Sequence, residues 1–471
     1  MPMHLFTPHR FLRPKPLLTF VLLLAGCSPF STHAPPSSVA VPAHFTQDPA
    51  GEPSDLSAWW RAWHDPALTW AIENALKANP DLRIARDRIL QAEATQAVAR
   101  STLGPTIGIT GNIAGGGMDW RNPYDIPARD AGTDGHLAGL AATWEPDLFG
   151  GRHAETKAAH AVVLAEQEKL HGVQMAIAAD VATHYVQVQS LRKQLTLLEE
   201  SLATLNRLKT YAQARFAAGQ AVLSDIQSVD EKINTLQARR PLLQTALNAS
   251  LRRMAILAGQ PPESATVPVS TTFLITPPAP AGELPDTVLR RRPDVAAAED
   301  LVSARLYHLR STKTDLLPRF GLQFFGGDGR LRFDGIPGLS GTGGLVALTS
   351  YLPIFTSGRI HARIAAADAQ LDEAVATYDK TLLSALADVE NAYEARTSQD
   401  QRIRDLSAAL SQSRANETAA RGLYEGGQRT LRDILDAKLD TLSVENALTQ
   451  AVAQQQIATV TLSYALGGGW H

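Results

Sequence analysis

The sequence predicts a protein of long α-helices with a small β portion, built from one structural unit that occurs twice. Three features predict it: an export signal that ends at a lone cysteine, a repeat across the two halves, and, in each half, two strand-like runs followed by a very long stretch almost free of helix breakers. The 471 residues carry a formal charge of −3. No basic block outside the first fifteen residues could neutralise a run of phosphates, so nucleic acid is not an expected partner.

Residues 1–26 have the pattern of a signal peptide. Basic residues precede a nearly all-aliphatic run at 17–24, and small residues follow it. This run is far shorter than the roughly 20 residues that a membrane-spanning helix needs. A permanent anchor helix is therefore not expected here.

Cys27 ends this segment in the order Leu-Ala-Gly-Cys, which resembles a bacterial lipobox, where cleavage leaves an acylated cysteine first. Ser28 follows in place of the Asp that usually favours the inner membrane. The lipobox leads us to expect lipid attachment at Cys27, and the absence of that Asp leads us to expect an outer-membrane location. Two or more acyl chains on Cys27 would be enough to anchor the protein stably. The alternative is an ordinary signal peptide with an incidental cysteine. Residues 27–55, rich in Pro, Ser and Ala, are expected to be a flexible spacer.

Two similar segments show that the chain is duplicated. Pro80 aligns with Pro293, 213 residues apart, and Pro105 aligns with Pro318 at the same separation. Helical stretches are expected from Leu68 to Thr102 and from Val295 to Leu316, each followed by one of the latter prolines, which stop helical pairing. The predicted organisation is a signal peptide at 1–26, the acylated end and spacer at 27–55, a first repeat at 56–260, a linker at 261–283 and a second repeat at 284–471.

Each repeat is expected to contain one β-hairpin, within 105–145 and 318–355. Period-two alternation and Gly-rich flanks favour strands over helix in these segments. The four predicted strands are 106–113, 137–144, 320–325 and 345–352, joined within each hairpin by a polar, Gly-rich loop.

A very long helical hairpin follows the strands in each repeat. The stretch from Arg359 to Arg421 has no Gly or Pro, and the stretch from Arg152 to Ala218 has one glycine. Apolar residues at spacings of three, four and seven indicate coiled coils. Pro241 is expected to kink the returning arm of the first hairpin or to split it in two.

Four strands in one chain are too few for a closed barrel, because membrane barrels start at about eight strands. Lipid tolerates no open sheet edge. If these strands enter a membrane, several chains must share them, and three copies would supply twelve. The alternative that periodicity leaves open is a soluble coiled-coil protein with two accessory hairpins.

Several segments together carry a resemblance to a known family. They read LSAWWRAWHDPALTWAIENALKANPDL, WEPDLFGGR, RFAAGQAVLSDIQ, VLRRRPDVAAAED, PIFTSGR, LYEGGQRTLRDILDAKLDTL and ALGGGW. The chain resembles the TolC/OprM outer-membrane efflux factors, in particular their NodT-type lipoprotein branch, over nearly all of its mature length.

The resemblance implies a homotrimer in the outer membrane of a Gram-negative bacterium. Its fold would be a twelve-stranded β-barrel, four strands per chain, continued by a long α-helical coiled-coil barrel in the periplasm. It implies an exit duct without chemistry of its own, which passively conducts small molecules from a periplasmic membrane-fusion adaptor and an inner-membrane pump of the resistance-nodulation-division type. The competing hypothesis is a periplasmic coiled-coil scaffold lipoprotein that forms no pore.

The resemblance also implies a gate at the ends of the helical hairpins. In the resembling proteins a Tyr and an Arg of one hairpin bond to an Asp of another, roles that match Tyr424, Arg429 and Asp225. Exposed charge pairs are worth about 0.2 to 1 kcal/mol each, so a docking partner could open them. Three solvated polar residues near a turn are the alternative.

Asp433 and Asp436 match aspartates of the family's pore constriction. Their i, i+3 spacing places them on one helix face, and in a threefold assembly they would form stacked acidic rings that attract cations. Surface charge is the alternative. Gly219, Gly426 and Gly427 are expected to supply left-handed turn conformations at the hairpin ends and to contact the adaptor.

No cofactor or metal is expected, and an enzyme is not predicted. One cysteine excludes zinc fingers and thiolate clusters. The chain has neither a nucleophile elbow nor a phosphate-binding glycine loop. Four histidines fall on one predicted helix, but His153 and His160 share a face at i, i+7, whereas metal ligation from one helix requires i, i+4. A metal-dependent hydrolase would therefore need direct evidence of bound metal.

Overall fold

The computed structural model describes residues 33–46, 51, 55–118, 131–263, 268–333 and 336–470, so Cys27 lies outside the described residues. The chain forms two compact units. The first comprises Leu90–Leu164 and Asp300–Ala376 together with the chain up to Pro36, and the second comprises Ser37–Ile89, Ala165–Glu299 and Thr377–His471.

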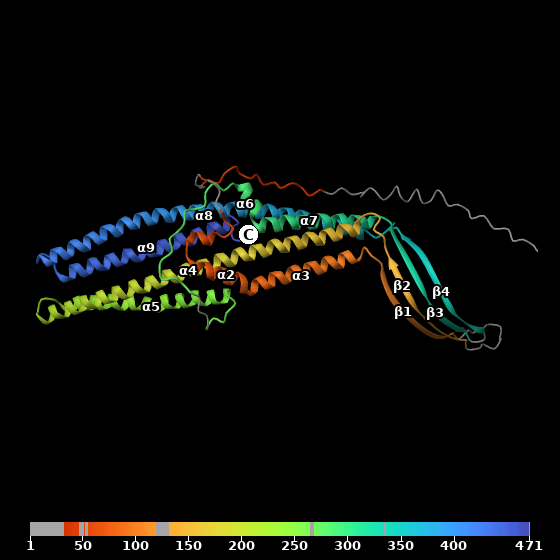
Figure 1. The fold of residues 1–471 in the computed structure, drawn as a ribbon, viewed down its shortest axis with the longest axis horizontal. Helices are drawn as coiled ribbons and strands as arrows, with labels where there is room; N and C mark the ends of the chain where they lie inside the picture. The colour runs from red at the N-terminus through yellow and green to blue at the C-terminus, as the bar shows by residue number, and fades with distance from the viewer. Residues whose placement is uncertain are drawn as a thin grey trace, which may run out of the picture. The chain divides into compact units, whose positions relative to one another are not determined.

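The first unit contains one antiparallel sheet of four strands in the order β1-β2-β3-β4 (Figure 1). Its strands are β1 (Thr106–Met118), β2 (Ala131–Trp144), β3 (Arg319–Phe333) and β4 (Ile336–Tyr351). The central pair joins the two repeats, with Trp144 opposite Leu322. Strands β1 and β4 form the outer edges of this sheet.

The strands are longer than the predicted runs, because much of the glycine-rich sequence expected to form loops pairs in the ladder. Strand β3 continues to Phe333 and β4 begins at Ile336. Glycine is required where the central strands approach closely. A Cβ at Gly139 would lie 2.5 Å from the carbonyl oxygen of Gly326, too close for any side chain.

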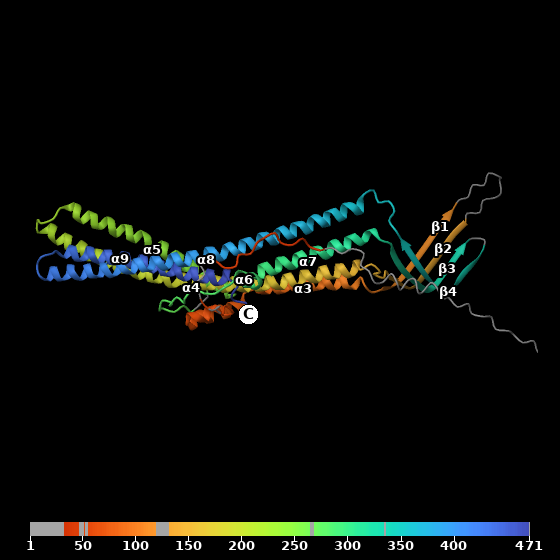
Figure 2. The same ribbon diagram turned by 90° about the horizontal axis from the view of Figure 1, so that it is seen from above.

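Two long helical hairpins dominate the rest of the chain. Helices α4 (Gly151–Ala217) and α8 (Arg359–Glu425) each contain 67 residues, a length of about 100 Å at 1.5 Å per residue. Helix α5 (Leu223–Leu257) returns beside α4, and α9 (Leu431–Ala465) returns beside α8 (Figure 1, Figure 2). None of the described helices combines the length and apolarity needed to cross a membrane.

Pro241 lies inside α5, which the structure describes as one continuous helix. Of the two predicted outcomes, the split of the arm is therefore wrong, and the kink at Pro241 stays a prediction. Proline removes only one backbone hydrogen bond and crowds one carbonyl, and the contacts along the α4–α5 hairpin, including the ion pair of Lys209 with Asp230, hold α5 in place.

The remaining helices are shorter, and the stretch expected to form one helix from 68 to 102 forms two, because Pro80 disfavours a helical conformation at Asn79, whose ψ is 130°. The shorter helices are η1 (Trp59–Trp63), α2 (Pro66–Ala78), α3 (Pro80–Ser101), α6 (Pro285–Arg291), α7 (Pro293–Lys313) and η2 (Thr314–Leu316). The core of the second unit includes the tryptophans of η1, which are at most 5% exposed, together with Ile72, Tyr185 and Tyr393. This aromatic packing explains why three tryptophans occur in so short a segment.

The N-terminal spacer differs from the expected flexible segment over residues 37–46. The hydroxyls of Ser37 and Ser38 donate to the two carboxylate oxygens of Asp379 on α8, at 2.6 and 2.7 Å, and these bonds lower the pKa of Asp379. Phe45 is buried against Tyr393, with 6.3 Å between ring centroids. The composition of the spacer could not reveal these partners, because they lie on a helix far along the chain.

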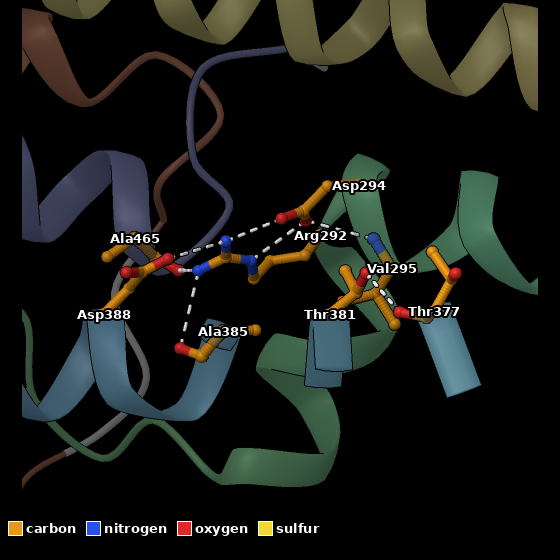
Figure 3. A network of polar contacts seen from close by, with 8 residues as sticks. All are labelled: Arg292, Asp294, Val295, Thr377, Thr381, Ala385, Asp388 and Ala465. Carbon is orange, nitrogen blue, oxygen red and sulfur yellow. Dashed lines mark hydrogen bonds and ion pairs between the residues drawn. The ribbon is translucent and has the colours of Figure 1, made fainter. Parts of the chain in front are cut away.

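A buried arginine joins three helices of the second unit (Figure 3). The side chain of Arg292 is 6% exposed. Its Nε and Nη2 donate to the carboxylate of Asp294 at 3.0 and 2.7 Å, and Nη2 also donates to Asp388 on α8 at 3.1 Å. Its Nη1 donates to the carbonyl oxygen of Ala465, in the last turn of α9, at 3.1 Å. One planar guanidinium therefore satisfies groups at the start of α7, on α8 and at the end of α9.

We predict that Arg292→Lys lowers the free energy of unfolding by about 2 to 4 kcal/mol, because a lysine keeps the charge but cannot make this fork of bonds. Urea unfolding followed by helical circular dichroism measures the loss. The matched control is Arg290→Lys, since Arg290 forms an exposed pair with Asp286 at 3.1 Å. That substitution should change stability by less than about 0.5 kcal/mol. Equal losses in the two variants would contradict the role of Arg292.

Candidate functional site

The predicted site lies at the ends of the two helical hairpins, in the turns between α4 and α5 and between α8 and α9. Gly219 and Gly427 adopt left-handed conformations, with φ of 69° and 73°. The amides of Gln220 and Gln428 donate to carbonyls five residues back at 2.8 Å, closing both helices in the same way. The expectation for Gly426 is wrong in one respect: it does not have a positive φ, since a single left-handed residue suffices to end α8.

Asp225 and Asp433 occupy equivalent positions in the first turns of α5 and α9. The backbone amide of Val222 donates to Asp225 Oδ2 at 3.2 Å, and that of Thr430 donates to Asp433 Oδ2 at 2.8 Å. Thr430 also donates its hydroxyl to the same oxygen at 2.7 Å. These bonds hold the pKa of Asp433 below its ordinary value. Both carboxylates therefore stabilise helix N-termini.

Arg432 links the two returning helices and was missed by the sequence analysis. Its Nη1 lies 3.6 Å from Asp225 Oδ1, and its Nε lies 3.4 Å from Asp436 Oδ2. The i, i+4 spacing to Asp436 was a local signal for the second pair. The first pair joins α5 to α9 and has no signature in the sequence.

The structure does not bring the three predicted latch residues together within one chain. Arg429 pairs with Asp433 at 3.7 Å, and Tyr424 is 43% exposed. Among the hydrogen bonds and ion pairs of the described residues, none joins Tyr424 or Arg429 to Asp225. The ion pairs at the hairpin ends are exposed and long, so they can break and re-form at little energetic cost.

The histidines on α4 have separate partners. His153 lies 2.6 Å from Asp147, His184 lies 3.2 Å from Asp180, and His171 stacks on Trp470 with 4.4 Å between ring centroids. Within the described part of the chain, no three metal-ligating side chains gather in one place.

Comparison with known proteins agrees with this fold. The family model "Outer membrane efflux protein" matches residues 71–260 and 284–468. The chain is 28% identical over 463 residues to the pyoverdine export outer membrane protein OpmQ of Pseudomonas aeruginosa, covering 96% of each protein. It is 26% identical over 464 residues to the toluene efflux pump outer membrane protein TtgI of Pseudomonas putida, covering 96% of this chain and 97% of that one.

Among solved structures, the outer-membrane channel OprN matches with a TM-score of 0.83 and 26% identity, covering 94% of this chain and 100% of that chain. A four-stranded sheet continued by two long helical hairpins is thus the fold of trimeric outer-membrane channels, and the predicted fold class is confirmed. The chain belongs to the outer membrane efflux protein family.

This membership confirms the predicted function and location. The protein is an outer-membrane exit duct of a tripartite efflux system, extends into the periplasm and is not an enzyme. The competing hypothesis of a scaffold lipoprotein without a pore is set aside, because the matches cover both repeats.

We predict that Thr430→Ala frays the first turn of α9, because it removes the side chain that caps the Asp433 amide. Hydrogen exchange of the amides at 431–434 should become about fivefold faster. The control is Thr418→Ala: the Thr418 hydroxyl donates to the Arg414 carbonyl within α8, at 2.9 Å, and its loss should leave α9 unchanged. Unaltered exchange at 431–434 in Thr430→Ala would contradict the capping role.

Proposed function

We propose that three copies of this chain form the duct and that it receives its cargo from a periplasmic adaptor and a resistance-nodulation-division pump. The duplicated four-stranded sheet supports this proposal, since three chains supply twelve strands. The relatives are named for the export of compounds as different as pyoverdine and toluene. We therefore propose that this chain conducts small organic molecules and that the pump selects them.

The hairpin ends are the proposed adaptor contacts, centred on Gly219, Gly426 and Gly427. All three glycines are exposed. Large apolar side chains beside them are exposed as well: Phe216, Val222, Leu223, Leu423 and Tyr424 are each between 39% and 61% exposed. A cluster of apolar side chains around a tight turn is suited to burial against another helical hairpin.

The proposed gate combines Asp225, Tyr424 and Arg429 between neighbouring hairpins, with Asp433 and Asp436 lining the constriction. The observation that carries it is the set of exposed ion pairs at this end, each 3.4 to 3.7 Å long. Contacts of this length in water are weak, so an adaptor that binds the adjacent turns can separate them. The carboxylates of Asp433 and Asp436 would lie at this end of the duct and favour the entry of cations.

We predict that Tyr424→Phe combined with Arg429→Ser raises single-channel conductance in planar bilayers, because it removes the bonds that hold neighbouring hairpins together. The purified channel in detergent should have three times the chain mass by light scattering. The control is Arg404→Ser, because Arg404 is an exposed arginine of α8 that bonds to Gln401 one turn away. The conductance of this variant should match that of the unmodified channel. Equal conductance of all three proteins would contradict the gate, and a monomeric mass would contradict the homotrimer.

Lipid attachment at Cys27 is a further proposal, supported by the lipobox-like sequence and by the absence of any other cysteine in the chain. We predict that Cys27→Ser abolishes incorporation of labelled palmitate. The variant should still fractionate with the outer membrane, because the strands rather than the acyl chains provide most of the membrane contact. Ser28→Ala serves as the control and should label normally. Palmitate on the Cys27→Ser protein would contradict the assignment.

A further inference from the structure

The sheet of the first unit has one apolar face in the half that adjoins the helices. Side chains alternate between the faces of a strand and paired residues share a face, so the strand registers assign each residue to one side. Six large apolar side chains on one face are between 40% and 87% exposed: Ile107, Ile109, Leu140, Trp144, Phe324 and Leu348. Apart from the paired Phe325 and Leu345, the opposite face carries mainly polar or small groups in this half, including Thr106, Thr143, Gln323 and Thr349. In an outer-membrane barrel the apolar face contacts lipid, so the opposite face lines the lumen.

Farther from the helices the two faces exchange their character. The charged or titratable side chains His136 and Arg330 now lie on the lipid-facing side, whereas Leu137, Leu331 and Leu339 lie on the lumen side. The three leucines are 40%, 41% and 70% exposed. Because the helices extend into the periplasm, this end of the sheet is the exterior end of the duct. An apolar cluster therefore stands on the lumen side of the exit, where barrel interiors are usually polar.

The leucines surround a shallow hollow of about 490 Å³. Glycines provide its floor, because a Cβ on Gly329 would lie 2.8 Å from Leu137 Cδ1 and one on Gly135 would lie 3.0 Å from Leu331 Cδ1. Each of these leucines thus occupies space that a side chain on the paired glycine would need. Two neighbouring rows of paired residues form the hollow: Asn112, Leu137, Gly329 and Gly341, and then Ala114, Gly135, Leu331 and Leu339. Among these eight residues Asn112 alone has a polar side chain.

We propose that this hollow is a transit site for uncharged, apolar small organic molecules, held by Leu137, Leu331 and Leu339 as they leave the duct. Its volume falls in the range of small-molecule sites, which are lined mainly by apolar side chains with a few polar groups. The hollow lies on the lumen face, which is continuous with the path of the cargo. The nearby charges of His136 and Arg330 belong to the other face, so nothing in the two rows favours an ion. This inference rests on the proposed homotrimeric duct and adds the class of molecule that its exit favours.

Protection of an engineered thiol tests the site. In a Cys27→Ser background, which has no native thiol, the Leu137→Cys protein is placed in lipid nanodiscs and treated with a charged, water-soluble methanethiosulfonate reagent. Toluene is the apolar probe, and benzoate, a charged molecule of similar size, is its control. A Kd of about 1 mM is reasonable for so small a ligand, so about 3 mM toluene should slow the reaction about fourfold. Benzoate should leave the rate unchanged.

Two further thiol positions control for the face and for the place along the strand. Thr143 lies on the lumen face nearer the helices, so Thr143→Cys should react at the same rate with and without toluene. Leu140 lies on the lipid-facing side, so Leu140→Cys should not react with the charged reagent.

Two glycine substitutions test the hollow itself. A Cβ on Gly341 or on Gly108 would meet nothing within 4 Å, so both positions have room for a side chain. Adding Gly341→Phe to Leu137→Cys fills the hollow and should abolish the protection by toluene. The matched control is Gly108→Phe, on the same face but four residues before Asn112 on β1, about 13 Å away. It should leave the protection intact.

The outcomes separate the site from the duct. An unchanged rate at Leu137→Cys in toluene, or equal slowing at Leu137→Cys and Thr143→Cys, would overturn the site and leave the duct intact. Reaction at Leu140→Cys without reaction at Leu137→Cys would overturn the assignment of the faces and the site with it. A monomeric mass by light scattering would overturn the homotrimer as well as the site.

Discussion

Backbone hydrogen bonding at the two outer strands is the constraint on which the rest of the structure depends. Strands β1 and β4 contain 13 and 16 residues, and in lipid no water can satisfy their free amides and carbonyls. The four strands of one chain form an open sheet, which other copies complete in the proposed homotrimer. The chain passes from β2 into α4 and from β4 into α8, and each of these helices has 67 residues.

The regular features of the fold were predictable from sequence because they depend on local pattern. The sequence itself shows the duplication and the prolines that end helices, Pro105 and Pro318. It also shows the long stretches almost free of helix breakers that form α4 and α8. The extent of the strands was not predictable, because glycine-rich segments normally indicate loops. Here glycines such as Gly139 permit close approach of neighbouring strands, a requirement that arises only once the strands are paired.

At the hairpin ends too, local contacts were predictable from the sequence and long-range contacts were not. The cap formed by Thr430 and Asp433 is local, and its Thr-x-x-Asp spacing could have been read as a capping motif. The pairing of Arg432 with Asp225 could not have been predicted, because the two residues are 207 positions apart on different hairpins. The proposed latch of Tyr424 and Arg429 has no local pattern either, since the resemblance places its partner on a neighbouring hairpin. Its residues were therefore proposed from family resemblance alone, and within one chain Arg429 pairs with Asp433.

The contact of residues 37–46 with α8 has a consequence for the order of folding and assembly. The bond between Ser37 and Asp379 joins positions 342 residues apart. Contacts between such distant positions close late, because the intervening chain must first be ordered. Export delivers the N-terminus first, so the segment that will lie along α8 reaches the periplasm long before α8 exists. During that interval an acyl tether near residue 27 would confine the unfolded chain to the bilayer surface, where the strands must eventually meet those of other copies. Docking of residues 37–46 onto α8 would then mark a chain whose folding is complete.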